Sequence, residues 1–92
     1  MPKSARTKVT AETLGELCLD HLTADPELLA RFMTDVGYDP AGLRRALGSF
    51  ELGLALIDWF AQREPPMVAL CAAHAIRPED FMAVWHRLNP AS

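Results

Sequence analysis

Residues 49–62 have the sequence SFELGLALIDWFAQ, which is apolar on nearly every side of a helix. At 100° per residue, the polar side chains fall within a stripe about 40° wide: Glu51, Asp58 and Gln62. Ser49 is a typical helix N-cap, so a helix is predicted over about 50–63. Such a helix must be covered on several sides, either as the central helix of a bundle or as the seam of an oligomer.

Five further helices are predicted from start signals that recur on both sides of this segment. Thr10 can cap a helix over about residues 11–23, and aspartate–proline pairs at 25–26 and 39–40 begin two more. Prolines after Glu64 and Arg77 begin the last two. No stretch alternates with the period-two pattern of a strand. The prediction is an all-α fold, a compact bundle of about six short helices.

Apolar residues at helical spacing define the face that each helix turns to the core. The predicted inward residues, besides those of the 49–62 segment, are Leu14, Leu17, Cys18, Leu22, Leu29, Phe32, Met33, Val36, Leu43, Leu47, Met67, Leu70, Cys71, His74, Phe81, Val84, Trp85 and Leu88. Four aromatic residues would form a binding hot spot if exposed, but their apolar stripes favour core packing: Tyr38, Phe50, Trp59 and Trp85. Tyr38, beside a turn glycine, is expected to be partly exposed.

The chain also aligns with itself when shifted by 38 residues, so that 13–47 matches 51–85 without a gap. The identical pairs include Leu14 with Leu52 and Gly15 with Gly53. Two interpretations stay open: an internal duplication, or the similarity that any two amphipathic three-helix segments share. Both describe two similar three-helix halves.

Charge is unevenly placed along the chain. The first eight residues carry two Lys and one Arg with no acid, and the remainder carries six Arg and all twelve acids. We therefore expect a disordered basic tail over residues 1–9 and a single helical domain over 10–90. The acidic body disfavours nucleic acid as a partner, since phosphate binding needs clustered positive charge.

Cellular location is predicted from features that the sequence lacks. Residues 1–10 contain no apolar core typical of a signal peptide. No apolar run approaches the roughly 20 residues of a membrane span. The two cysteines, far apart in the sequence, are interpreted as reduced buried thiols. Together these features predict a cytoplasmic protein without a membrane partner.

Residues 32–46 resemble the helix-turn-helix motif of DNA-binding proteins, with Gly37 at the turn. In that hypothesis Arg44 and Arg45 contact phosphate or guanine. The competing interpretation is simple packing of two short helices across a tight turn. It is favoured because the would-be recognition helix begins Pro-Ala-Gly, which offers no base-reading side chain, and because aspartates flank the turn.

Two Cys-x-x-His pairs could in principle supply four zinc ligands: Cys18 with His21 and Cys71 with His74. Both pairs lie in the middle of predicted helices, whereas zinc motifs usually place one pair on a loop. Buried cysteines beside half-exposed histidines are the ordinary explanation, so no metal and no cofactor is predicted.

No catalytic machinery is predicted either. No serine lies in a nucleophile context, and no glycine loop could cradle a phosphate. Asp20 and Asp58 occupy equivalent positions of the two halves, but solvated helix faces explain them better than paired catalytic carboxylates. The prediction is a protein that is not an enzyme and has no catalytic residue.

Several segments together resemble a family of small bacterial proteins, the domain of unknown function 3572. They are Asp25–Phe32, Gly37–Arg44, Leu56–Phe60 and Leu70–Ala73. The resemblance spans about residues 12–88 with its spacing intact. It departs at His21 and His74, where the family commonly has small or apolar residues. It implies a bacterial, alphaproteobacterial helical protein and gives no catalytic residues to carry over.

The function predicted from these features is a non-enzymatic module for protein–protein interaction or regulation. Its partner would be an unknown protein or a second copy of the chain. The alternative is DNA binding through Arg44 and Arg45.

Overall fold

The computed structural model describes residues 9–90, which form six α-helices and no strand. The helices are α1 (Ala11–Thr23), α2 (Pro26–Val36), α3 (Pro40–Ala46), α4 (Phe50–Ala61), α5 (Glu64–His74) and α6 (Pro78–Leu88). The predicted all-α fold is confirmed. The predicted basic tail lies outside the described residues except for Val9. None of the described helices is long and apolar enough to cross a membrane.

The helices begin where the sequence signals place them. In α1 to α4, the N-cap side chain accepts a hydrogen bond from the backbone N–H three residues later: the caps are Thr10, Asp25, Asp39 and Ser49. The last two helices follow an arginine that makes no such bond, and each has a proline in its first turn. Proline leaves one donor fewer to satisfy at the helix start, which partly replaces a cap.

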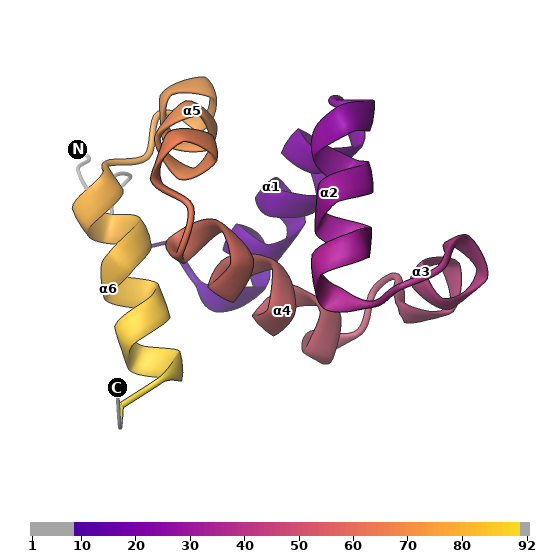
Figure 1. The fold of residues 1–92 in the computed structure, drawn as a ribbon. Helices are drawn as coiled ribbons and strands as arrows, with labels where there is room; N and C mark the ends of the chain where they lie inside the picture. The colour runs from indigo at the N-terminus through magenta and orange to yellow at the C-terminus, as the bar shows by residue number, and fades with distance from the viewer. Residues whose placement is uncertain (1–8, 91–92) are drawn as a thin grey trace.

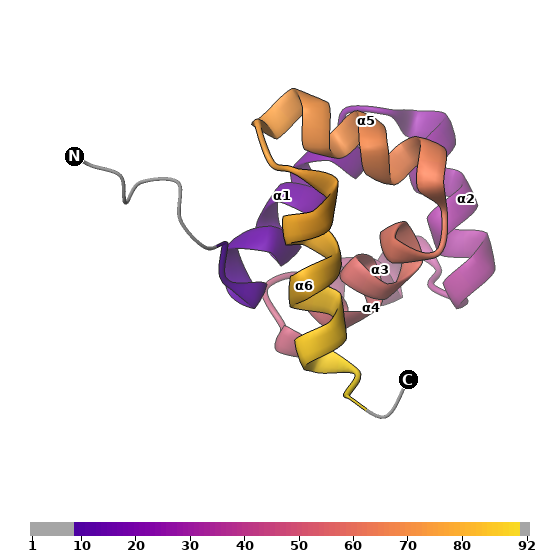
Figure 2. The same cartoon turned by 90° about the vertical axis from the view of Figure 1, so that its left-hand side faces the viewer.

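The central position of α4 is clear in Figure 1, where it lies beside α1 with α2 and α3 on one side and α5 and α6 on the other. It packs against α1, α5 and α6, and Figure 2 shows α5 and α6 together on one side of this arrangement. Its buried side chains are Leu52, Leu56, Ile57, Trp59 and Phe60. Most of its apolar surface is therefore covered within one chain, which favours the central-helix interpretation over the seam of an oligomer.

Three residues predicted to face the core are exposed instead. Val36 is 41% exposed, Leu47 50% and Phe50 57%. Each stands at the end of a helix: Val36 is the last residue of α2, Phe50 is the first of α4, and Leu47 follows the end of α3. Apolar spacing identifies a face of a helix but does not say where the neighbouring helix that should cover it ends.

The two halves repeat the same helix order and the same connection between their last two helices. Gly37 and Ala75 both have left-handed backbone conformations, with φ of 95° and 57°. The two N–H groups at each turn bond to the carbonyl of Met33 in one half and Cys71 in the other, again 38 residues apart. The halves differ in α3, which has 7 residues against 11 in α6. Descent from a duplication stays an interpretation.

Candidate functional site

The backbones of α1 and α4 approach each other closely at Gly15 and Gly53. A Cβ atom built on Gly15 would lie only 3.1 Å from the Cα of Gly53. Carbon atoms in ordinary contact are about 3.5–4.0 Å apart, so an alanine at residue 15 would require the two backbones to move slightly apart. The crossing places the first half of α1 alongside the first half of α4.

An open groove of about 180 Å³ lies along this crossing. We call it the α1–α4 groove. It is lined by Ala11, Glu12, Gly15, Glu16 and Leu19 of α1, by Gly48 and Ser49, and by Phe50, Leu52, Gly53, Leu54, Leu56 and Ile57 of α4. The lining is mostly apolar, and Phe50 is its most exposed large hydrophobic residue. Sequence reasoning missed this groove because it depends on how closely the two helices cross.

The charged residues that line the groove are both negative. Glu12 and Glu16 line it from α1, and Asp20 follows one turn later. Neither α1 nor α4 contains a lysine or an arginine. Within residues 9–90 the ion pairs are Arg63 with Asp35 and Arg77 with Asp80, so none involves an acid of the groove. In the part of the chain that the structure describes, the groove therefore combines an apolar lining with an acidic edge that no ion pair neutralises.

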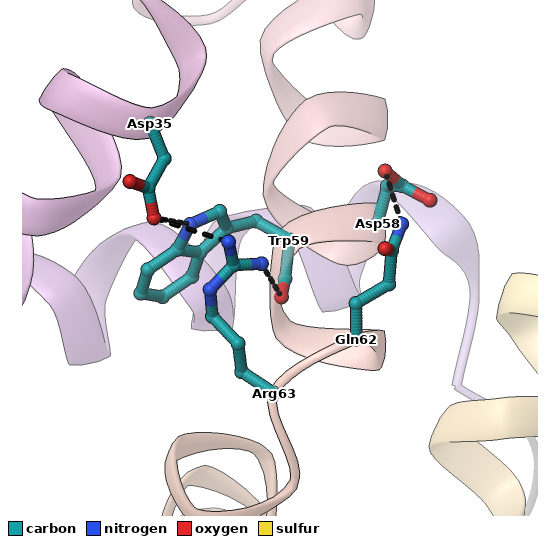
Figure 3. A network of polar contacts seen from close by, with 5 residues as sticks. All are labelled: Asp35, Asp58, Trp59, Gln62 and Arg63. Atoms are coloured by element: carbon teal, nitrogen blue, oxygen red, sulfur yellow. Dashed lines mark hydrogen bonds and ion pairs between the residues drawn. The ribbon is translucent and has the colours of Figure 1, made fainter.

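A polar network ties α2 to the C-terminal end of α4 (Figure 3). Asp35 accepts a hydrogen bond of 3.0 Å from Trp59 Nε1 and forms an ion pair of 3.1 Å with Arg63. The guanidinium of Arg63 lies over the Trp59 ring at 4.6 Å and donates to the Trp59 carbonyl. This arrangement satisfies the indole N–H of a tryptophan that is only 3% exposed. The network is explained by stability and needs no ligand.

Asp58 has a similar structural role, which corrects its prediction as a solvated residue. It is half-buried, and one carboxylate oxygen accepts a 2.9 Å hydrogen bond from Trp85 Nε1 while the other accepts from Gln62. Asp20, its counterpart in the first half, is exposed as predicted. A carboxylate on a nearly apolar helix needs a donor when it is buried, and that signal was present in the sequence.

The two Cys-x-x-His pairs come together only in part. The rings of His21 and His74 meet edge to face, with centroids 6.2 Å apart, and both cysteines are buried free thiols. In the part of the chain that the structure describes, no group of three or more His, Cys, Asp or Glu side chains is arranged to hold a metal ion.

The thiols themselves are in an environment that keeps them protonated. Burial raises the pKa of the Cys18 thiol, and the neighbouring Cys71 raises it further. Burial also raises the pKa of Cys71, with a smaller contribution from Asp80. Since the thiolate is the reactive form, both cysteines have the character of inert core residues.

The helix–turn–helix arrangement predicted in the first half is formed by α2, Gly37 and α3. Arg44 and Arg45 are exposed in the last turn of α3. The carboxylate of Asp39, however, caps the start of this short helix through Gly42 N–H. The helix therefore offers one pair of arginines at its end and an acidic group at its start, which is a small basic surface for binding a phosphate backbone.

Comparison with known proteins gives one match. A family model described as Protein of unknown function (DUF3572) matches residues 8–91, which include all six helices. No curated protein and no solved structure matches the chain.

Proposed function

The chain belongs to the family described as Protein of unknown function (DUF3572), and we propose that it is a non-enzymatic module that binds another protein through the α1–α4 groove. The observation that carries this proposal is the exposure of Phe50. Its side chain is 57% exposed at the edge of the groove, although it belongs to the most buried helix of the fold.

Phe50 does not stand alone on this surface. Leu47, three residues earlier at the α3–α4 connection, is 50% exposed. Exposed large apolar side chains are enriched at interaction sites, where such side chains supply most of the binding energy. A phenylalanine exposed to this extent contributes much less to folding than the ~1.5–3 kcal/mol of a fully buried one. A role in binding therefore explains why the Phe50 side chain is exposed, whereas a role in folding does not.

The titratable groups elsewhere support a role other than catalysis. Asp35 and Asp58 are engaged by tryptophan N–H groups, and the thiols are buried with raised pKa values. An enzyme needs side chains whose pKa values suit proton transfer or nucleophilic attack on a substrate, and whose reactive atoms are not engaged in structural hydrogen bonds. These groups instead have structural partners.

The proposal is tested by co-purification from the source cells with two matched substitutions. Phe50→Ser removes the exposed side chain at the groove. Val68→Ser removes a 42% exposed side chain on α5, outside the groove. Both should leave the melting temperature nearly unchanged, since exposed positions contribute little to stability. We expect a protein that co-purifies in equal amounts with wild type and Val68→Ser, and is lost with Phe50→Ser. Equal recovery with all three, or no partner at all, contradicts the proposal.

A further inference from the structure

The two helices that form the α1–α4 groove carry charges of only one sign, which restricts the kind of partner that the groove can bind. The helices that form it contain five carboxylates, Glu12, Glu16, Asp20, Glu51 and Asp58, and no lysine or arginine. Only Asp58 has a hydrogen bond to another helix. Within residues 9–90, no lysine or arginine forms an ion pair with the exposed carboxylates of these two helices, which leaves them available to a cationic partner.

We propose that the groove binds a basic amphipathic segment of another protein, which inserts one large apolar side chain and places arginine or lysine over Glu12 and Glu16. This inference rests on the proposed function and adds the chemistry of the partner. Arginine is the better match, because its guanidinium can engage a carboxylate with two hydrogen bonds and is weakly hydrated.

The size of the groove fits a single anchor. Its volume of about 180 Å³ is comparable to that of an apolar cavity of roughly 150 Å³ that holds one benzene ring, so it has room for one large apolar side chain. The glycines at the crossing carry no side chain that would fill this space. Phe50 and Leu54 line the groove from α4 and offer the anchor an apolar contact.

Charge complementarity also argues against two other occupants. The rest of the chain beyond the first eight residues carries twice as many acids as arginines, so a second copy would bring its acidic body against an acidic groove. Nucleic acid would bring phosphates to the same carboxylates. A basic segment gains from both the apolar lining and the acidic edge, whereas like-charge contacts disfavour the other two occupants.

The inference is tested with a display library of random peptides selected on the full-length protein. The enriched peptides are then synthesised, and their dissociation constants are measured against four variants. Phe50→Ser tests the groove, and the double variant Glu12→Lys with Glu16→Lys reverses the charge of its edge. The double variant Glu27→Lys with Glu79→Lys is the control for this charge reversal, because it changes the net charge by the same amount at residues that do not line the groove. Val68→Ser is the control for Phe50→Ser.

Selected peptides that carry one or two large apolar residues among several arginines or lysines would support the inference. Their affinity should fall about tenfold when the charge of the groove edge is reversed and should fall with higher salt. It should change much less with Glu27→Lys and Glu79→Lys together. Peptides that bind at Phe50 without net positive charge would overturn the partner chemistry and leave the proposed function standing. No enrichment, or binding that Phe50→Ser does not weaken, would overturn both. A wild-type dimer in light scattering that Phe50→Ser dissociates would make a second copy the occupant and overturn the inference.

Discussion

The glycine pair at the α1–α4 crossing makes one substitution act differently at two positions. Gly15→Ala places a Cβ 3.1 Å from the Cα of Gly53, whereas Gly53→Ala places a Cβ 3.9 Å from the Cα of Gly15. Contacts between carbon atoms are ordinary at about 3.5–4.0 Å. The alanine at residue 53 therefore fits, while the alanine at residue 15 pushes the two backbones apart by about 0.5 Å.

The size of the effect follows from two opposing contributions. Each alanine gains about 1 kcal/mol over glycine in helix propensity, and this gain cancels when the two variants are compared. Overpacking a tight contact costs about 1–3 kcal/mol, and only Gly15→Ala incurs that cost. We therefore expect Gly53→Ala to be as stable as wild type or up to about 1 kcal/mol more stable. Gly15→Ala should be about 1–3 kcal/mol less stable than Gly53→Ala.

Urea denaturation followed by circular dichroism measures this difference directly. Wild type and both variants should show the same dependence of unfolding free energy on urea, so that the midpoints report stability alone. If Gly15→Ala is as stable as Gly53→Ala, or more stable, the close approach of α1 and α4 is refuted, and with it the shape assigned to the groove.

Three further outcomes are expected. Asp35→Asn keeps an acceptor for Trp59 Nε1 and loses only a partly exposed ion pair, so it should lower the free energy of unfolding by about 1 kcal/mol or less. Asp35→Ala leaves the indole N–H unpaired and should lower it by about 1–3 kcal/mol. Equal melting temperatures for these two variants would contradict the network. The pKa values of the Cys18 and Cys71 thiols are raised in the folded state, so their contribution to stability should be intact below about pH 8.5 and should fall as the pH rises further. The urea midpoint of wild type should therefore approach that of the double variant Cys18→Ala with Cys71→Ala at alkaline pH. A difference between the two midpoints that does not change with pH would contradict the burial of the thiols. The protein should not retard duplex DNA at low salt, with or without alanines at the two arginines of α3; retardation that those alanines abolish would restore the DNA-binding alternative.

Helix positions were predictable because the signals for them are local. A cap at Thr10, an aspartate–proline pair at residue 25 and a glycine at residue 37 each act within a few residues, so the chain itself carries the information. The central role of α4 followed from the same kind of reasoning, since a helix without a polar face has to be covered.

What the sequence could not provide is which helix lies opposite which. The hydrogen bonds of Trp59 and Trp85 reach carboxylates 24 and 27 residues away, and no periodicity points to such a partner. The prediction that Phe50 is buried was wrong for the same reason. Its apolar neighbours in the sequence indicated burial, but no other helix within residues 9–90 covers it, and it is exposed. The self-alignment did pair Gly15 with Gly53, but only the packing of α1 on α4 shows that they touch.

Photo-cross-linking in the source cells tests most directly whether the exposed end of α4 is a binding surface. A photoreactive phenylalanine analogue replaces Phe50 in one variant and Val68 in the other, since both side chains are exposed and only Phe50 lines the groove. We predict a discrete adduct with another protein from position 50, and little or none from position 68. No adduct from position 50, or the same adduct in equal yield from both positions, would contradict the assignment of function to the α1–α4 groove.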